Sequence, residues 1–152
     1  MGSDASKTAT ERAELERLIC AAHLDISTIE KLDGERMPDF KCLSSAGEEF
    51  AFEVTSICAP EVAQLIATGQ AGSDGAIWTA DPTRRIVCGK LHKSYNTPLP
   101  IDLLCYWDGR TVSWDELIIA EIEKALLEAG KNPFRRIWFH GEDGAKLLRN
   151  AS

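Results

Sequence analysis

The sequence predicts one α/β domain, a three-layer α/β/α sandwich in which helices cover both faces of a mixed central sheet. Two observations predict this class. Short apolar segments at 37–43 and 49–57 flank a turn of small and polar residues, a pattern typical of an antiparallel hairpin. After the hairpin, apolar strands alternate with amphipathic helices, an order that favours parallel pairing with helices on both faces.

The chain is expected to begin with a tail followed by a helix. Residues 1–9 are polar, and we expect them to be poorly ordered, so that a single domain spans 10–152. A helix is predicted over 10–24 with Thr10 as its N-cap. Apolar residues recur there at three- and four-residue spacing: Leu15, Leu18, Ile19 and Ala22.

Alternating helices and strands are predicted for the rest of the chain. They are a helix over 61–67, a helix over 82–95, a strand over 101–107, a helix over 113–130, a strand over 135–140 and a helix over 143–149. In the longest of these, Ser113 and Glu116 have the spacing of a capping box, and Gly130 is the expected C-cap.

Composition and hydropathy exclude several classes of protein. No apolar run approaches the ~20 residues that cross a bilayer, and the N-terminal segment lacks the apolar stretch of a signal peptide. We therefore expect a cytoplasmic protein with no membrane contact. The spacing of the five cysteines favours reduced thiols over a disulfide framework or a zinc site. His140, at the end of an apolar strand, is a further site candidate.

The charge of the chain is distributed unevenly. A net charge of -7 argues against a protein that coats nucleic acid by bulk electrostatics, which needs an excess of Lys and Arg. Residues 82–101 nevertheless contain no acid, and they hold Arg84, Arg85, Lys90 and Lys93. One interpretation is a nucleic-acid-binding patch formed by Arg84, Arg85 and Lys93, and the other is a solvated helix face.

Two acids in the hairpin predict a metal site. With the turn centred on 45–47, residues whose numbers sum to about 92 lie opposite one another, so Asp39 faces Glu53. Like charges repel there, and burying a carboxylate costs several kcal/mol unless it is paired, neutralised or bound to a metal. We therefore expect a hard cation, Mg²⁺ or Mn²⁺, between the acids, with the main-chain carbonyl of Val54 as a further ligand.

The hairpin resembles the PD-(D/E)xK nuclease superfamily. The resemblance is carried by "PDF", which ends the first strand, and by "FEVTSI" in the second, and it extends over about 10–107. It implies a restriction-endonuclease-like core with a helix, a hairpin that bears the acid pair, a crossover helix and a further strand. It also implies metal-dependent hydrolysis of phosphodiester bonds in DNA or RNA, with Asp39 and Glu53 holding the metal.

The sequence departs from the superfamily pattern at Thr55, where the motif has a lysine that orients the attacking water. Some members supply this lysine from the following helix, which makes Lys90 the candidate here and Lys93 the alternative. Both lysines could instead extend into solvent from a helix surface. The superfamily often adds an acid from the first helix, and Glu11 or Glu14 could fill that role unless they are surface charges.

Three hypotheses about function follow from these residues. The first is a metal-dependent nuclease with Asp39, Glu53 and Lys90 as its catalytic residues. The second is a non-catalytic binding or regulatory module of the same fold, in which Thr55 marks the lost lysine. The third is an interaction protein without an active site, which forms a homodimer or binds a partner subunit through its sheet edge or Trp78.

Overall fold

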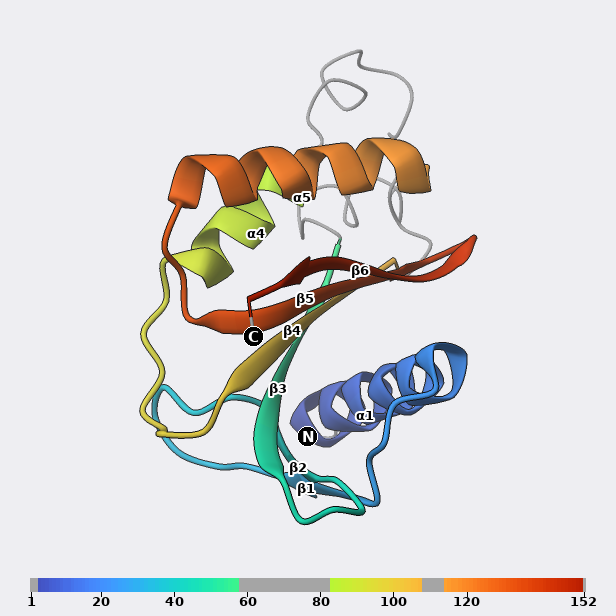
Figure 1. The fold of residues 1–152 in the computed structure, drawn as a ribbon, viewed down its shortest axis with the longest axis vertical. Coiled ribbons are helices and arrows are strands. Elements are labelled where there is room, and N and C mark those ends of the chain that lie inside the picture. Colours follow the sequence, from blue (N-terminus) through green and yellow to red (C-terminus); the bar gives the residue numbers. More distant parts are fainter. Residues whose placement is uncertain (1–2, 58–82, 108–113, 152) are drawn as a thin grey trace.

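The computed structural model describes residues 3–57, 83–107 and 114–151. Within these ranges the chain forms the following elements (Figure 1): α1 (Ser3–Ala22), β1 (Thr28–Lys31), β2 (Phe40–Leu43), β3 (Glu49–Ser56), α4 (Thr83–Leu91), β4 (Ile101–Tyr106), α5 (Asp115–Ala129), β5 (Phe134–Gly141) and β6 (Gly144–Asn150). The helix predicted over 61–67 and Trp78 lie outside the described residues. No helix within the described ranges is long and apolar enough to span a membrane.

The strands form one mixed sheet in the order β1-β2-β3-β4-β5-β6. Strands β1, β2 and β3 pair antiparallel, β3, β4 and β5 pair parallel, and β6 returns antiparallel to β5. The predicted mixed α/β fold, with a leading hairpin and later parallel strands, is thus confirmed. Figure 1 shows α1 against one face of the sheet and α4 and α5 against the other.

Each face of the sheet has its own apolar core, because side chains alternate along the strands. On one face, α1 packs against the hairpin and β4 through a cluster that includes Leu15, Leu18, Phe50, Phe52 and Val54. On the other face, α4 and α5 pack through a cluster that includes Val87, Leu91, Leu103, Ile118 and Ile122. The odd-numbered side chains of β3, Glu53 among them, therefore lie on the side of the sheet that α4 covers.

The register of the hairpin is the predicted one. Strands β2 and β3 pair with Phe40 opposite Phe52, so that the numbers of paired residues sum to 92. The turn is closed by the N–H of Gly47, which donates to the carbonyl of Ser44 at 3.1 Å. Gly47 has a φ of 88°, which glycine adopts without steric strain. The turn and the pairing together fix where the residues just beyond β2 must lie.

Helix α1 begins at Ser3 rather than at residue 10. Thr10 therefore lies inside the helix and is not its N-cap, and the helix includes most of the segment expected to be a poorly ordered tail. The physical reason is that Ala5, Lys7 and Ala9 favour a helix without adding large apolar residues to its periodicity. The apolar stripe becomes visible only at Leu15, where the helix meets the sheet.

The C-terminal segment is a strand, so the prediction of a helix over 143–149 is wrong. Strand β6 pairs antiparallel with β5. Asp115, at the start of α5, holds the connection, because its carboxylate accepts the N–H of Glu142 at 3.1 Å and the N–H of Asp143 at 2.7 Å. A segment this short does not distinguish a hydrophobic period of 2.0 from one of 3.6, and this tertiary contact favours the hairpin.

The ends of α5 differ in how far they can be compared with the prediction. The helix begins after Trp114, which makes no side-chain capping hydrogen bond. The predicted capping box pairs Ser113 with Glu116. Ser113 itself lies outside the described residues. Asp115 and Glu116 in the first turn instead place negative charge at the positive end of the helix dipole. The C-cap is confirmed, because Gly130 has a φ of 64° and its N–H donates to a carbonyl one turn earlier.

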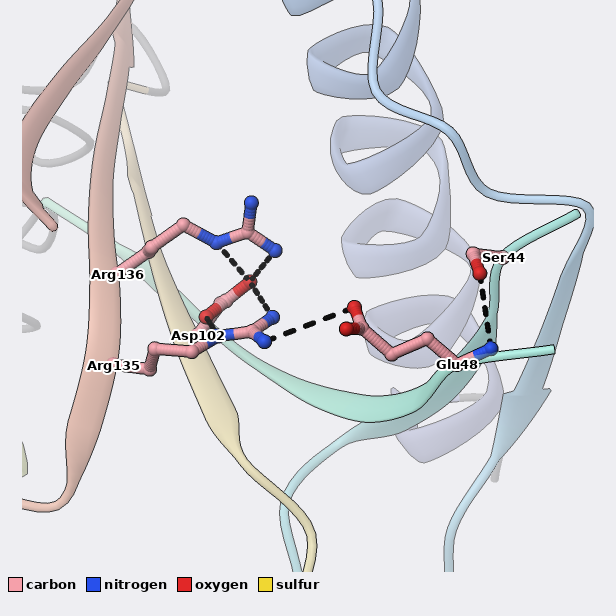
Figure 2. A network of polar contacts seen from close by, with 5 residues as sticks. All are labelled: Ser44, Glu48, Asp102, Arg135 and Arg136. Atoms are coloured by element: carbon pink, nitrogen blue, oxygen red, sulfur yellow. Dashed lines mark hydrogen bonds and ion pairs between the residues drawn. The ribbon is translucent and has the colours of Figure 1, made fainter. Parts of the chain in front are cut away.

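A network of ion pairs joins the turn of the hairpin to the first residues of β4 (Figure 2). Asp102 is fully buried, and both Arg135 and Arg136 bind its carboxylate, with a shortest distance of 2.9 Å from Arg136 Nη2. Two adjacent arginines reach one carboxylate because the register of β4 and β5 shifts at this point. Arg135 also lies 3.7 Å from Glu48, whose N–H donates to Oγ of Ser44.

We expect Asp102→Asn to lower the free energy of unfolding by about 1.5–3 kcal/mol, the range for hydrogen bonds to charged groups. The amide keeps the size of the side chain but leaves both arginines without their buried counter-charge. Urea denaturation followed by circular dichroism measures the change. Glu48→Gln is the matched control, because Glu48 is largely exposed and an exposed ion pair contributes at most about 1 kcal/mol. Equal losses in the two variants would contradict a dominant role for Asp102.

Candidate functional site

A cavity of about 480 Å³ lies beside the hairpin, where α1, β3 and α4 approach one another. Acidic and basic side chains dominate its lining. The lining residues are Lys7, Glu11, Met37, Asp39, Glu53, Val54, Thr55, Ser56, Ile86, Lys90, Lys93 and Tyr106. Most of the site residues predicted from the sequence are among them, although they come from segments far apart in the chain. We call this cavity the acid-pair cavity.

Asp39 occupies the position that the hairpin register predicts. Strand β2 begins at Phe40 rather than at residue 37, so Asp39 lies just before the strand. The main-chain pairing of β2 and β3 ends at Phe40 and Phe52. Beyond it, Oδ2 of Asp39 takes the place of a main-chain acceptor and binds the N–H of Val54 at 2.8 Å. Its own carbonyl accepts the N–H of Leu32 at 3.0 Å. The Asp39 carboxyl group is thereby held against that of Glu53, with which it interacts directly.

Glu53 is a buried carboxylate whose two oxygens have different surroundings. Oε2 accepts hydrogen bonds from Nζ of Lys90 at 2.8 Å and from the hydroxyl of Tyr95 at 3.0 Å. Nζ of Lys93 lies 3.6 Å from the same oxygen. Oε1 is buried and has no ordinary hydrogen-bond donor among the described residues. A buried acceptor without a donor is costly, so Oε1 is the atom at which a cation or a proton is expected.

The two acids have pKa values that are shifted in opposite directions. Burial and the charge of Glu53 raise the pKa of Asp39 from 3.8 to about 7, against the opposing effect of the Val54 N–H. Burial also acts to raise the pKa of Glu53, but Lys90 and Lys93 outweigh it, and this pKa lies below its ordinary value. Near neutral pH, Glu53 is therefore ionised, whereas Asp39 is protonated in a fraction of the molecules. This proton can bridge the two carboxyl groups.

The main chain of Val54 faces the edge at which Asp39 lies. On β3 the N–H groups of Ala51 and Ile57 donate to carbonyls on the β4 side, so odd-numbered residues present their backbone groups to β4. Val54 therefore presents its N–H and carbonyl to the opposite side, beyond the last pair with β2. The Val54 carbonyl is thus directed to the edge where the acid pair lies, as a metal ligand would have to be.

The first helix contributes Glu11 to the acid-pair cavity. Glu11 is buried, and burial raises its pKa, while Lys7 and Lys31 partly offset this effect. Its charge also acts on Asp39 and Glu53. Of the two acids suggested from this helix, Glu11 therefore lies near the pair, at a distance that permits electrostatic interaction.

Three predicted residues do not join the acid-pair cavity. Glu14 forms an ion pair with Arg17 at 3.0 Å and lines a different cavity, which also contains His140. Arg84 pairs with Glu128 of α5. Arg85 is exposed on α4 and does not line the cavity. Glu14 lies one turn beyond Glu11 near the same face of α1, so its side chain reaches the neighbouring cavity. Arg84 and Arg85 are six and five residues before Lys90, spacings that place them on other faces of α4.

Two residues near the acid pair were missed by reasoning from the sequence. Lys7 lines the cavity from a segment that was expected to be a disordered tail. Tyr95 is the last residue of the helix predicted over 82–95, but α4 ends at Leu91, and the Tyr95 hydroxyl donates to Glu53 from beyond the helix. A tyrosine near the end of a basic helix carries no distinctive spacing, so no local signal could have identified it. Thr55 lines the cavity beside Glu53, as predicted.

Comparisons of this chain with protein-family models, with curated proteins and with solved structures give no match. The function therefore has to be inferred from the residues of the cavity.

The donors at the acid pair fit a hard cation. Within 3–57, 83–107 and 114–151, no group of three or more His, Cys, Asp or Glu side chains is arranged to hold a metal. The fit depends on two carboxylates and one carbonyl: Oε1 of Glu53, the carboxylate of Asp39 and the carbonyl of Val54. Mg²⁺ and Mn²⁺ prefer oxygen ligands, and Mg²⁺ is commonly held by one or two carboxylates with water completing its coordination.

We expect Asp39→Asn to make the metal-free protein more stable than the wild type, by an amount that grows with pH. Because the pKa of Asp39 is raised, the folded protein holds this proton more tightly than the unfolded chain does. The wild type therefore loses stability as pH rises above 3.8, and the loss is complete above about 7. Asparagine has no such proton, and its side-chain carbonyl can still accept the Val54 N–H.

Chemical denaturation of both proteins from about pH 5 to about pH 8 measures this difference. Because its pKa is lowered, Glu53 stays ionised over this pH range, so the pH dependence of the difference between the two proteins comes from Asp39. A difference that stays constant or shrinks as pH rises contradicts a raised pKa at Asp39.

Proposed function

We propose that this chain is a metal-dependent phosphodiesterase of the PD-(D/E)xK type, acting on DNA or RNA. The observation that carries this function is the convergence of Asp39, Glu53 and Lys90 on one cavity. The fold of the proposed enzyme is the three-layer sandwich with a restriction-endonuclease-like core. The elements of this core are α1, the hairpin β2–β3 and β4. Helix α4 supplies the lysine that is absent at residue 55, where the chain has Thr55.

The energetics of the acid pair support a cation. Two adjacent carboxylates, one buried and one partly buried, repel each other, and the raised pKa of Asp39 reflects this cost together with that of burial. Lys90 and Lys93 neutralise Glu53 from one side, through Oε2. Oε1 and the Asp39 carboxylate then remain as the oxygens that a divalent cation would neutralise, with the Val54 carbonyl beside them.

The residues of the cavity divide the proposed reaction among them. When bound, Mg²⁺ or Mn²⁺ would lower the pKa of a coordinated water and offset charge on the phosphate. Asp39, after releasing its proton to solvent, would hold the metal together with Glu53. Lys90 pairs with Glu53 in the structure and shifts towards the phosphate when substrate binds. Its ammonium there orients the water and stabilises developing negative charge. Water attacks phosphorus directly and passes its proton to solvent. The P–O bond to the leaving sugar oxygen breaks, and this oxygen takes a proton from solvent, with no covalent enzyme intermediate.

Basic residues at the rim of the cavity suit a phosphate-rich substrate. Lys7 from α1 and Lys93 from the segment after α4 both line it. The side chain of Lys93 is 42% exposed, so it can contact phosphate while remaining near Glu53. Arg84 is paired with Glu128, and in this proposal it does not contact the scissile phosphate.

A non-catalytic binding module is the second candidate function. The observation that favours it is that Lys90, Lys93 and Tyr95 already satisfy Oε2 of Glu53 without a metal. In that case the lysines are structural partners of a buried acid, and the cavity retains its basic rim for binding alone.

Cleavage assays distinguish the two functions. Wild-type protein is incubated with supercoiled plasmid, single-stranded DNA and structured RNA, in Mg²⁺, in Mn²⁺ and in a chelator. The double variant Asp39→Asn/Glu53→Gln, purified in parallel, controls for contaminating nucleases. Cleavage that needs both the metal and the acid pair supports the enzyme. Binding of nucleic acid without cleavage, equal in the two proteins, supports the binding module.

A further inference from the structure

Tyr95 lies beside the acid pair and packs against the apolar core beneath α4 and α5. It lies in the segment between α4 and β4, and its ring packs edge to face against Phe134 of β5, with centroids 5.7 Å apart. The ammonium of Lys93 lies over the same ring at 5.2 Å. The hydroxyl of Tyr95 donates to Oε2 of Glu53 at 3.0 Å. The ring thus spans from the apolar core beneath α4 and α5 to the buried carboxylate.

The other donor to Glu53 cannot serve as a fixed support during the proposed reaction. Lys90 has a flexible four-carbon stem and carries the charge that the phosphate requires. Once its ammonium moves to substrate, Oε2 of Glu53 loses its shorter hydrogen bond, the one at 2.8 Å. A tyrosine hydroxyl has no charge to share with the substrate, and the Tyr95 ring packs against Phe134 of β5.

We propose that Tyr95 is a positioning residue, which holds Oε2 of Glu53 so that Oε1 stays directed at the cation beside Asp39 when Lys90 turns to substrate. This role rests on the proposed function. Tyr95 donates a hydrogen bond to Oε2, the oxygen of Glu53 that is not proposed to contact the metal. Supporting contacts of this kind fix the orientation of a ligand and raise metal affinity.

Tyr95→Phe tests this role, because phenylalanine keeps the ring contacts with Phe134 and Lys93 and removes only the hydroxyl. Calorimetric titration with Mn²⁺ is expected to give an affinity about 10- to 100-fold weaker than that of the wild type. Circular dichroism and a thermal melt of the metal-free variant establish that it folds.

The outcomes separate this role from the proposed function. If the wild type binds Mn²⁺ and Tyr95→Phe binds it equally well, the positioning role is overturned and the metal site stands. A lowered melting temperature with unchanged Mn²⁺ affinity also overturns it, because Tyr95 then acts only through packing. A wild type that binds no Mn²⁺ overturns the proposed function and the positioning role together.

Discussion

Replacing Glu53 by glutamine is expected to weaken Mn²⁺ binding by more than about 100-fold, beyond the effect of removing a group that merely orients a ligand. The carboxylate contributes both the negative charge and the buried Oε1, and the amide removes the charge while keeping the shape. Metal-dependent cleavage should disappear with the metal. Calorimetric titration measures the affinity without a substrate, so the result does not depend on finding the right nucleic acid.

Glu14→Gln is the matched control for this variant. It makes the same chemical change on α1, but Glu14 pairs with Arg17 and lies in another cavity, so Mn²⁺ affinity should not change. The loss of Mn²⁺ affinity in Glu11→Gln should lie between those of Glu53→Gln and Glu14→Gln. Glu11 is buried near the acid pair and acts on it through its charge. A Glu53→Gln protein that binds Mn²⁺ as tightly as the wild type would exclude Glu53 as a ligand.

Replacing Lys90 by alanine is expected to lower kcat by about 10²- to 10⁴-fold, the usual contribution of a group that assists proton transfer. KM should change little, because Lys93 and Lys7 remain to contact phosphate. Steady-state kinetics on a cleaved substrate separates the two constants. Lys93→Ala is the comparison, and its larger effect should be on KM. If Lys90→Ala weakens kcat and substrate binding equally, Lys90 only contacts phosphate and does not assist the chemical step.

A relocated lysine gives a stricter test of the same idea. Thr55 and Glu53 both line the cavity and both project on the α4 side of β3, so a lysine at residue 55 could reach the same volume. In the Lys90→Ala background, Thr55→Lys should restore part of kcat. Failure of the double variant to regain turnover, in a folded protein that still binds Mn²⁺, would argue against an ammonium as the missing catalytic group.

The acid pair could be predicted from the sequence because it depends on local rules. The turn and the alternation of apolar residues fix the register of β2 and β3, and the register then brings Asp39 to Glu53. The geometry departs from the prediction only in that Asp39 precedes the strand and uses its side chain, not its main chain, to contact Val54.

The edge strands could not be predicted in the same way. Strand β1 (Thr28–Lys31) is short and mostly exposed, so its side chains carry no clear alternation. It becomes a strand by pairing with β2, a tertiary interaction that no local pattern reveals. Strand β6 depends in turn on Asp115, which binds the backbone of its turn from a distant helix.

The remaining site residues were predictable only as candidates. Spacing along the helix predicted over 82–95 allowed either Lys90 or Lys93. The structure brings both ammonium groups to Glu53, with Lys90 at 2.8 Å and Lys93 at 3.6 Å. Tyr95 reaches the same oxygen from a segment with no regular structure, whose path is set by packing on Phe134. Long-range packing of this kind leaves no periodic signal in the sequence.

The most direct test of a metal site at the acid pair is a crystal soaked in Mn²⁺, with anomalous diffraction recorded near the manganese edge. The account predicts a peak at about 2 Å from Asp39 and from Oε1 of Glu53, within reach of the Val54 carbonyl, with Tyr95 still bound to Oε2. A crystal that shows no peak in this cavity at a manganese concentration that occupies other carboxylates, with Lys90 still closing on Glu53, would contradict it.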